Sequence, residues 1–243
     1  MSLRTEAFFI HLSLSAVLAV LALLLVFKLW YPAPLHVAVG VTQIFLLLLL
    51  VDVVLGPLLT LLVCKPGKKT LVLDLTVIAI LQLSALCYGL WVVAEGRPAW
   101  LVFNSDRFDL VRVLDIDERK LDGALPEYRN PSMSGPRWVA AVSPVGADAR
   151  NELMFEAALG GSDLPQRPDF YRPLVDVQDE IRQRSRAMSG LQDFNSVEDV
   201  QAITRKWPAA GSWLPLMAGV PMVVLLHKES YEVLTVVDLR PWL

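Results

Sequence analysis

Cysteine is scarce in this sequence, and its placement excludes several classes of site. The 243 residues include two cysteines, Cys64 and Cys87, and both lie in apolar stretches. No pair is spaced as Cys-x-x-Cys, so the pattern of a zinc or redox site is missing. We therefore expect no disulfide framework, no metal site and no cofactor.

Known catalytic motifs are also missing. The sequence has no Gly-x-Ser-x-Gly, no His-Glu-x-x-His and no glycine-rich phosphate loop. The one histidine of the charged second part, His227, follows an apolar run beside a predicted turn, which is typical of a solvated hairpin residue. The pI of about 5.6 argues against a nucleic-acid partner. We expect that the protein is not an enzyme. The alternative is a membrane-anchored enzyme or binding module that acts on lipid or glycan.

Charge is scarce in the first 95 residues, which hold five of the 22 basic and four of the 25 acidic residues. Three apolar runs lie there, at about 7–29, 37–64 and 71–94. Each run exceeds the roughly 20 residues that a helix needs to cross the hydrocarbon core. We predict a three-span transmembrane region over residues 1–96 and a separate domain over residues 97–243. The length of the first run, and its lack of a small-residue cleavage site, argue against a signal peptide.

Basic residues predict the orientation of these spans. Lys65, Lys68 and Lys69 lie in the short loop between the second and third runs, and Arg4 precedes the first. Short loops rich in Lys and Arg stay in the cytoplasm. We therefore expect a cytoplasmic N-terminus in a bacterial inner membrane, with residues 97–243 in the periplasm.

A carboxylate interrupts the second apolar run. Asp52 lies one turn before Gly56 and Pro57, and Pro57 is expected to bend the helix. An ionisable group at mid-helix costs about 2.5–3.5 kcal/mol on insertion scales, so it is a functional-site hypothesis by default. Counted from the cytoplasmic ends, Asp52 and Gln82 lie at similar depths, roughly 20 and 18 Å. We predict that these two side chains meet.

A second polar contact is expected nearer the cytoplasmic side, between Asp74 and His11. Two interpretations of these polar groups stay open. They either hold the three helices together, or they contact a polar group on the transmembrane helix of a partner. A proton or ion pathway is a weaker third interpretation, because one mid-membrane acid and three helices are little material for a transporter.

The charged second part is predicted to be an α+β domain with an antiparallel sheet and helices on one face. Apolar, partly alternating stretches indicate strands, and amphipathic stretches with turn residues at their ends indicate helices. Strands are expected within 99–103, 108–116, 137–144, 213–219, 221–229 and 231–239, and helices within 148–161, 171–188 and 195–207.

Residues 29–112 resemble a known family, the TfpX/TfpZ-like accessory proteins of type IV pilins. The most specific element is the pattern Asp-x-x-Leu-Gly-Pro-Leu-Leu-Thr with basic residues after it. Its members here are Asp52, Leu55, Gly56, Pro57, Leu58, Leu59 and Thr60, followed by Lys65, Lys68 and Lys69. Cys64 departs from the apolar or aromatic residue expected at its position.

This resemblance implies a non-enzymatic inner-membrane factor that assists the stability or assembly of a specific major type IV pilin. The expected partners are that pilin, the pilus assembly machinery and membrane lipid. A pilin waits in the membrane on one apolar helix, with its globular domain in the periplasm. The candidate partner-binding residues are Asp52, Gly56, Pro57, Asp74 and Gln82.

Overall fold

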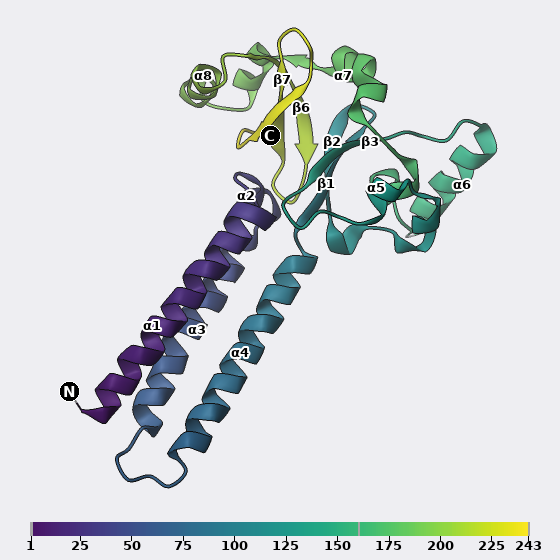
Figure 1. Cartoon of the computed structure of the whole chain (residues 1–243). Coiled ribbons are helices and arrows are strands. Elements are labelled where there is room, and N and C mark those ends of the chain that lie inside the picture. Colours follow the sequence, from purple (N-terminus) through teal and green to yellow (C-terminus); the bar gives the residue numbers. More distant parts are fainter. Residues whose placement is uncertain (1, 160, 243) are drawn as a thin grey trace.

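The computed structural model describes residues 2–159 and 161–242 and divides into two parts (Figure 1). Three long helices lie side by side at one end, and a domain built on a β-sheet lies at the other. The predicted class is confirmed, since three apolar helices able to span a membrane precede a domain of strands and helices.

The three long helices are α1 (Leu3–Leu24), which continues as a π-helix over Leu25–Trp30, α3 (Val41–Val63) and α4 (Leu71–Glu95). The second of them begins later than the run from residue 37 suggested. Gly40 adopts a φ of +76° and separates the short helix α2 (Leu35–Val39) from α3. Glycine adopts this conformation at low cost because it has no Cβ.

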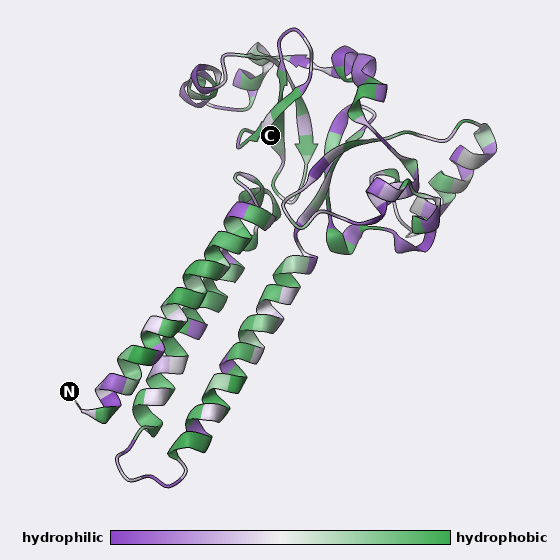
Figure 2. Cartoon of the chain, viewed as in Figure 1, coloured by the Kyte–Doolittle hydropathy of each residue, from purple (hydrophilic) through white to green (hydrophobic). Residues whose placement is uncertain are grey.

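Most exposed side chains of these helices are large and apolar, and the buried ones include small and polar residues. Figure 2 shows that apolar residues dominate the three ribbons. Leu47 is 62% exposed, whereas Ala22 and Ser15 are buried. The buried residues of α3 recur three or four positions apart, at Val41, Phe45, Leu49, Asp52, Gly56, Pro57 and Thr60. This spacing forms one helix face, and both α1 and α4 pack on α3.

The sheet follows the order β4-β3-β1-β2-β6-β7-β8, with β5 paired to β6 beside this path. Its strands are β1 (Pro98–Asn104), β2 (Arg107–Arg112), β3 (Arg137–Ala141), β4 (Tyr171–Arg172), β5 (Arg186–Ala187), β6 (Ala210–Met217), β7 (Met222–His227) and β8 (Val233–Val237).

The sheet is mixed, whereas we predicted an antiparallel one. The hairpins β1–β2, β6–β7 and β7–β8 are antiparallel, as are the pairs β3–β4 and β5–β6. The pairs β1–β3 and β2–β6 are parallel. Parallel neighbours need a long crossover, and the segments between these strands supply it.

Helices cover both faces of the sheet, whereas we predicted one covered face. They are α5 (Pro126–Arg129), α6 (Ala147–Ala158), α7 (Gln178–Arg184) and α8 (Val197–Lys206). On one face, Phe103 and Leu214 pack against Ile181 of α7. On the other face, Trp213 packs against Val200 of α8. Each strand therefore contributes to two cores, because its side chains alternate between the faces.

The helix expected over 171–188 is much shorter. Only α7 is α-helical there, and a 3-10 segment (Leu174–Val177) precedes it. Pro173 disfavours a helical conformation at the residue before it, and Arg172 belongs to β4. The expected helix near 148–161 is present as α6, although its predicted end at Gly160 lies outside the described residues.

The domain is bonded to the upper ends of the helices. The backbone N–H of Val220, in the β6–β7 turn, donates to the carbonyl of Ala38 in α2 at 2.8 Å. At the same end the first long helix is tied to α4, since the hydroxyl of Tyr31 donates to the carbonyl of Val93 at 2.7 Å. Leu35 and Ala38 are buried against the sheet core. These contacts hold the sheet at a set position above the helices.

Candidate functional site

A chain of hydrogen bonds joins the three long helices. His11 of α1 lies 2.6 Å from the hydroxyl of Thr60 through Nδ1, and 2.9 Å from Oε1 of Gln82 through Nε2. The Gln82 amide nitrogen donates to Ser15 Oγ at 3.0 Å and to the backbone carbonyl of Asp52 at 2.9 Å. These five residues are called the interhelical network below.

Gln82 is the central member of the network, and its side-chain oxygen and nitrogen both have hydrogen-bond partners. An amide oxygen only accepts, so Nε2 of His11 donates to Gln82. The neutral imidazole that fits this arrangement then accepts the Thr60 hydroxyl at Nδ1. Gln82 uses its oxygen and both amide hydrogens. In hydrocarbon an unpaired polar group is costly, so this arrangement favours one fixed packing of α1, α3 and α4.

Gly56 makes the position of Gln82 possible. A Cβ added at Gly56 would lie 1.9 Å from Gln82 Oε1. Small residues let transmembrane helices approach closely. Asp52, Gly56 and Thr60 are spaced by four residues and therefore share the face of α3 on which the network lies. This face carries the polar and small members of the sequence signature.

Asp52 also lines a groove that opens outside the network. One cavity of about 210 Å³ lies between Leu55 and Gly56 of α3 and Ile78 and Ala85 of α4. A second, of about 330 Å³, continues it towards Ile44. Both are lined by Asp52, Val51 and Ala85, so they form one continuous α3–α4 groove. From Leu59 to Ile44 it covers 16 residues of α3, or 15 helical steps, roughly 22 Å at helical rise.

The groove has apolar walls and a small, polar centre. Its lining is apolar apart from Asp52 and Gln82. A third cavity of about 70 Å³ lies on the α1 side of Asp52, among Ser15, Gln82 and Leu86. The Asp52 side chain thus has access to cavities on both sides of the seam between α3 and α4. This arrangement can receive an apolar helix that carries a polar group at the same depth.

Two sequence predictions about contacts have different outcomes. Asp52 and Gln82 are bonded, but the Gln82 amide donates to the Asp52 backbone carbonyl and not to the side-chain carboxyl that we predicted. The pairing of Asp74 with His11 is wrong. Asp74 instead binds Lys68 at 2.7 Å and the Thr70 hydroxyl at 3.0 Å, both in the loop before α4. The flexible Lys68 side chain is close to Asp74 in the sequence, so it reaches this carboxylate more readily than His11 on another helix does.

The four basic residues from which we predicted the orientation lie together at one end of the helices. The Arg4 guanidinium donates to the backbone carbonyl of Cys64 at 2.7 Å. This bond brings the N-terminus beside the loop that holds Lys65, Lys68 and Lys69. Figure 1 shows the N-terminus and this loop at the end of the helices opposite the sheet domain.

Sequence reasoning did not assign His11 and Thr60 to the Gln82 contact. The available signal was the four-residue spacing of Asp52, Gly56 and Thr60, which matches the four-residue spacing of His11 and Ser15 on α1. Residues at that spacing lie on one face of a helix. Which two faces meet depends on the offset between the helices, which this spacing does not contain.

Comparisons with known proteins identify the family. A family model described as "Fimbrial assembly protein FimB" matches residues 1–40. A fimbrial assembly protein of serogroup E1 from Dichelobacter nodosus is 31% identical over 232 residues, which cover 90% of this chain and 89% of the relative. A serogroup I protein of the same organism is 33% identical over 182 residues, 74% of this chain and 70% of the relative. The chain belongs to the fimbrial assembly protein family. No solved structure matches it.

In this fimbrial assembly protein the sheet domain carries its own charged cluster, outside the three long helices. The Arg119 guanidinium binds the buried carboxylate of Asp117 at 2.7 Å, and the Ser162 hydroxyl donates to the same carboxylate. The bonds from Arg119 hold the pKa of Asp117 well below its ordinary value. Arg167, which is also buried, binds Asp169 and Glu156. Both Arg167 and the Asp117 cluster fasten α6 and its flanking loops to the sheet.

The described part of the domain holds no group of three His, Cys, Asp or Glu residues placed to bind a metal ion. His227 accepts from the backbone N–H groups of Glu229 and Ser230 through Nδ1. It therefore caps the β7–β8 turn, which is a structural role. The family names of the relatives indicate an assembly protein rather than an enzyme.

Proposed function

We propose that this protein assists fimbrial assembly by receiving the apolar helix of a major type IV pilin in the α3–α4 groove. The observation that carries the proposal is the groove itself. It is an apolar channel that runs roughly 22 Å along α3, with a carboxyl group and small residues at its centre. Gly56 and Ala85 allow a helix to approach closely, and Asp52 offers a partner for a polar group on it.

The family supports this choice of occupant. The relatives are named fimbrial assembly proteins, and the signature resembles that of the TfpX/TfpZ-like pilin accessory proteins. The signature residues Asp52 and Gly56 line the groove, and Pro57 lies in the next position of the same helix. Asp74 lies outside the groove, where it orders the loop through Lys68. We propose that its role is to fix the start of α4.

We further propose that the helices cross the bacterial inner membrane with the N-terminus in the cytoplasm and the sheet domain in the periplasm. Arg4, Lys65, Lys68 and Lys69 share one end of the helices, as the positive-inside rule requires of a cytoplasmic end. In a chain without its two cysteines, Ser105→Cys should react with an impermeant maleimide added to the periplasm, and Ser2→Cys should not. The reverse labelling would overturn the orientation.

The decisive experiment is co-purification of the major pilin with the tagged protein in mild detergent. Asp52→Leu should leave the protein in the membrane at its normal level and weaken pilin capture. Glu6→Leu is the matched control, because Glu6 is an exposed acid at the N-terminal end of α1. It should capture pilin normally.

Two outcomes would reject the proposal. The first is unchanged capture by Asp52→Leu together with unchanged surface piliation. The second is a drop in abundance for both Asp52→Leu and Gln82→Leu with no specific loss of capture, which would assign the polar groups to helix packing alone. Absence of pilin from every sample, with normal fibres in cells that lack the protein, would direct attention to lipid or glycan ligands of the domain.

A further inference from the structure

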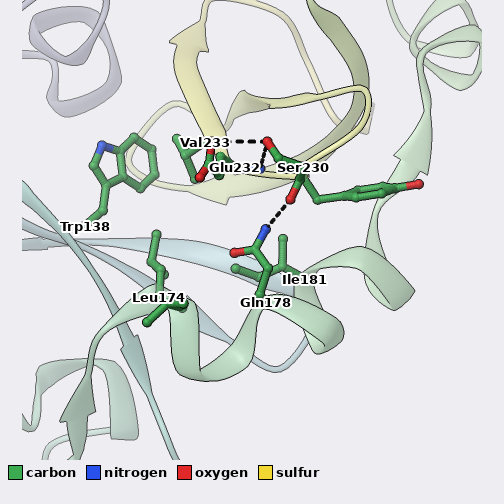
Figure 3. A pocket seen from close by; sticks show the side chains of 9 residues that line it. Trp138, Leu174, Gln178, Ile181, Ser230, Glu232 and Val233 are labelled. Atoms are coloured by element: carbon green, nitrogen blue, oxygen red, sulfur yellow. Dashed lines mark hydrogen bonds between the residues drawn. The ribbon is translucent and has the colours of Figure 1, made fainter.

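A cavity of about 360 Å³ lies in the sheet domain, between the β7–β8 hairpin and α7 (Figure 3). Trp138 of β3, with Leu174 and Val175 of the 3-10 segment before α7, forms one side. Glu232 and Val233, at the start of β8, form the other. This cavity is called the edge groove below. Figure 1 places α7 and this hairpin at the end of the domain away from the helices, so the edge groove is remote from the α3–α4 groove.

The strand beside the edge groove has an unpaired edge. β8 ends the strand order and pairs only with β7 within the described residues. Its sequence, Val-Leu-Thr-Val-Val, contains no charge and no proline. Natural sheet edges are usually blunted by charged residues, by proline or by shortness. The opposite edge strand β4 is blunted, since it has two residues and Pro173 follows it.

The edge groove is held open by fixed contacts. The Gln178 amide of α7 donates to the backbone carbonyl of Ser230 at 2.7 Å, as Figure 3 shows. The Arg182 guanidinium lies 5.5 Å from the ring centre of Tyr231. The Trp138 ring meets Phe108 edge to face at 5.1 Å. A preformed site costs less to occupy, because little ordering remains to be done on binding.

The cavity lies between α7 and the turn that leads into β8, and Val233, the first residue of this unpaired strand, lines it. An unpaired strand that begins beside a partly apolar cavity can bind an extended peptide by strand addition. The peptide backbone bonds to the free edge, and alternate side chains enter the cavity. Trp138, Leu174 and Val233 favour a large apolar side chain. Glu232 is exposed, and its carboxylate makes no ion pair within the described residues and accepts only the Ser230 hydroxyl, at 3.1 Å. Its charge favours a Lys or Arg nearby.

We propose that the edge groove binds an extended segment of a partner protein, which adds a strand to β8. The segment places a large apolar side chain in the cavity and a basic side chain beside Glu232. This inference stands on the sheet edge and the cavity, and it does not depend on the α3–α4 groove or on the identity of the partner there.

The test uses the full-length protein in detergent micelles and fluorescent acetylated heptapeptides of the form Thr-Val-Thr-Xaa-Thr-Lys-Thr. With Leu or Phe as Xaa the peptide should bind, and with Ser or Asp it should bind roughly tenfold more weakly or worse. Methylation of alternate backbone nitrogens of the Leu peptide should also weaken binding about tenfold or more, because it removes the N–H donors that would bond to the free edge of β8.

Two protein variants complete the test. Val175→Arg puts a bulky cation into the edge groove and should abolish binding. Val197→Arg is the matched control, because Val197 is an exposed valine on α8 outside the edge groove. This variant should bind the Leu peptide normally. Glu232→Gln should weaken binding of the Lys peptide several-fold and leave a peptide with Gln in place of Lys unaffected.

The proposal is overturned if none of the peptides binds, or if binding ignores backbone methylation and Val175→Arg. It is also overturned if the protein self-associates through this face, so that Val175→Arg changes the oligomeric state while no peptide binds. In that case the occupant of the edge groove is a second copy of the chain.

Discussion

Leu47 of α3 and Leu214 of β6 are the same residue type in opposite surroundings. Leu47 is 62% exposed on a helix able to cross a membrane, and Leu214 is fully buried between the sheet and its helices. Buried polar residues occur in both parts, but they differ in kind. Among the long helices they include the small hydroxyl residues Ser15 and Thr60, whereas the domain buries the charged residues Asp117 and Arg167 in ion pairs.

The difference follows from the solvent of each part. Water drives apolar side chains into the core of the domain. Lipid tails are as apolar as leucine, so burying leucine between membrane helices gains little, and close packing and hydrogen bonds decide which faces meet. Small and polar residues therefore occupy key positions on the contact faces of α1, α3 and α4, whereas large apolar residues fill the core of the domain.

The largest expected effect tests this contrast directly. Leu214→Ala should lower the free energy of unfolding of the domain by about 2–5 kcal/mol, because it leaves a cavity in a packed core. Leu47→Ala should change the stability of the helices by less than about 1 kcal/mol, because the side chain has no protein partner to lose. Denaturation of the full chain in detergent, followed by tryptophan fluorescence and by protease resistance, measures both. Equal losses would contradict the contrast.

The charged cluster of the domain should make its stability depend on pH. Asp117 has a lower pKa in the folded state than in the unfolded chain, so its stabilising effect is fully present above the unfolded pKa. The effect is lost as the pH falls from the unfolded pKa through the folded pKa. Asp117→Asn should lower stability at pH 7 by about 1–3 kcal/mol and should flatten the loss below about pH 5.

The exposed neighbour Asp122 supplies the control for this pH experiment. Asp122→Asn should leave both the stability at pH 7 and its acid dependence unchanged. If Asp117→Asn has the same acid dependence as the unmodified protein, the ion pair with Arg119 does not carry the effect.

An added methyl group on the contact face of α3 should destabilise the protein, just as the removal of side-chain atoms destabilises the domain core. Gly56→Ala directs its Cβ to within 1.9 Å of the Gln82 amide, so that amide must leave the interhelical network. We expect a loss of about 1–3 kcal/mol, seen as a lower midpoint of unfolding in detergent. Gly190→Ala, with no atom within 4 Å of the new Cβ, should be close to neutral.

The smallest effect concerns the hydrogen bond between His11 and Gln82. A double-mutant cycle with His11→Leu and Gln82→Leu should give a coupling energy of roughly 0.6 kcal/mol, the average for bonds between membrane helices. The pair His11→Leu and Asp74→Leu should be additive, because Asp74 binds Lys68 instead. Coupling in the second cycle and none in the first would favour the pairing expected from depth alone.

Much of the fold was accessible from local pattern. The three apolar runs, the turn between β1 and β2 and the hairpin of β7 and β8 agree with the structure, because length, alternation and turn residues are properties of neighbouring positions. The proximity of Asp52 and Gln82 was also predicted, although the acceptor is the Asp52 backbone carbonyl and not its carboxyl. The start of α3 was missed because Gly40 reads as one more small residue within an apolar run, and its positive φ is visible only in three dimensions.

The amino-acid sequence by itself determined the class of this protein. Apolar length specifies helices able to cross a bilayer, and charge and alternation specify a folded domain after them. Only the tertiary structure decided that β1 lies parallel to β3, that His11 meets Gln82, and that β8 keeps a free edge beside a cavity. These features depend on the offset and pairing of segments far apart in the chain, and such offsets follow from packing and hydrogen bonding across the whole molecule rather than from local pattern.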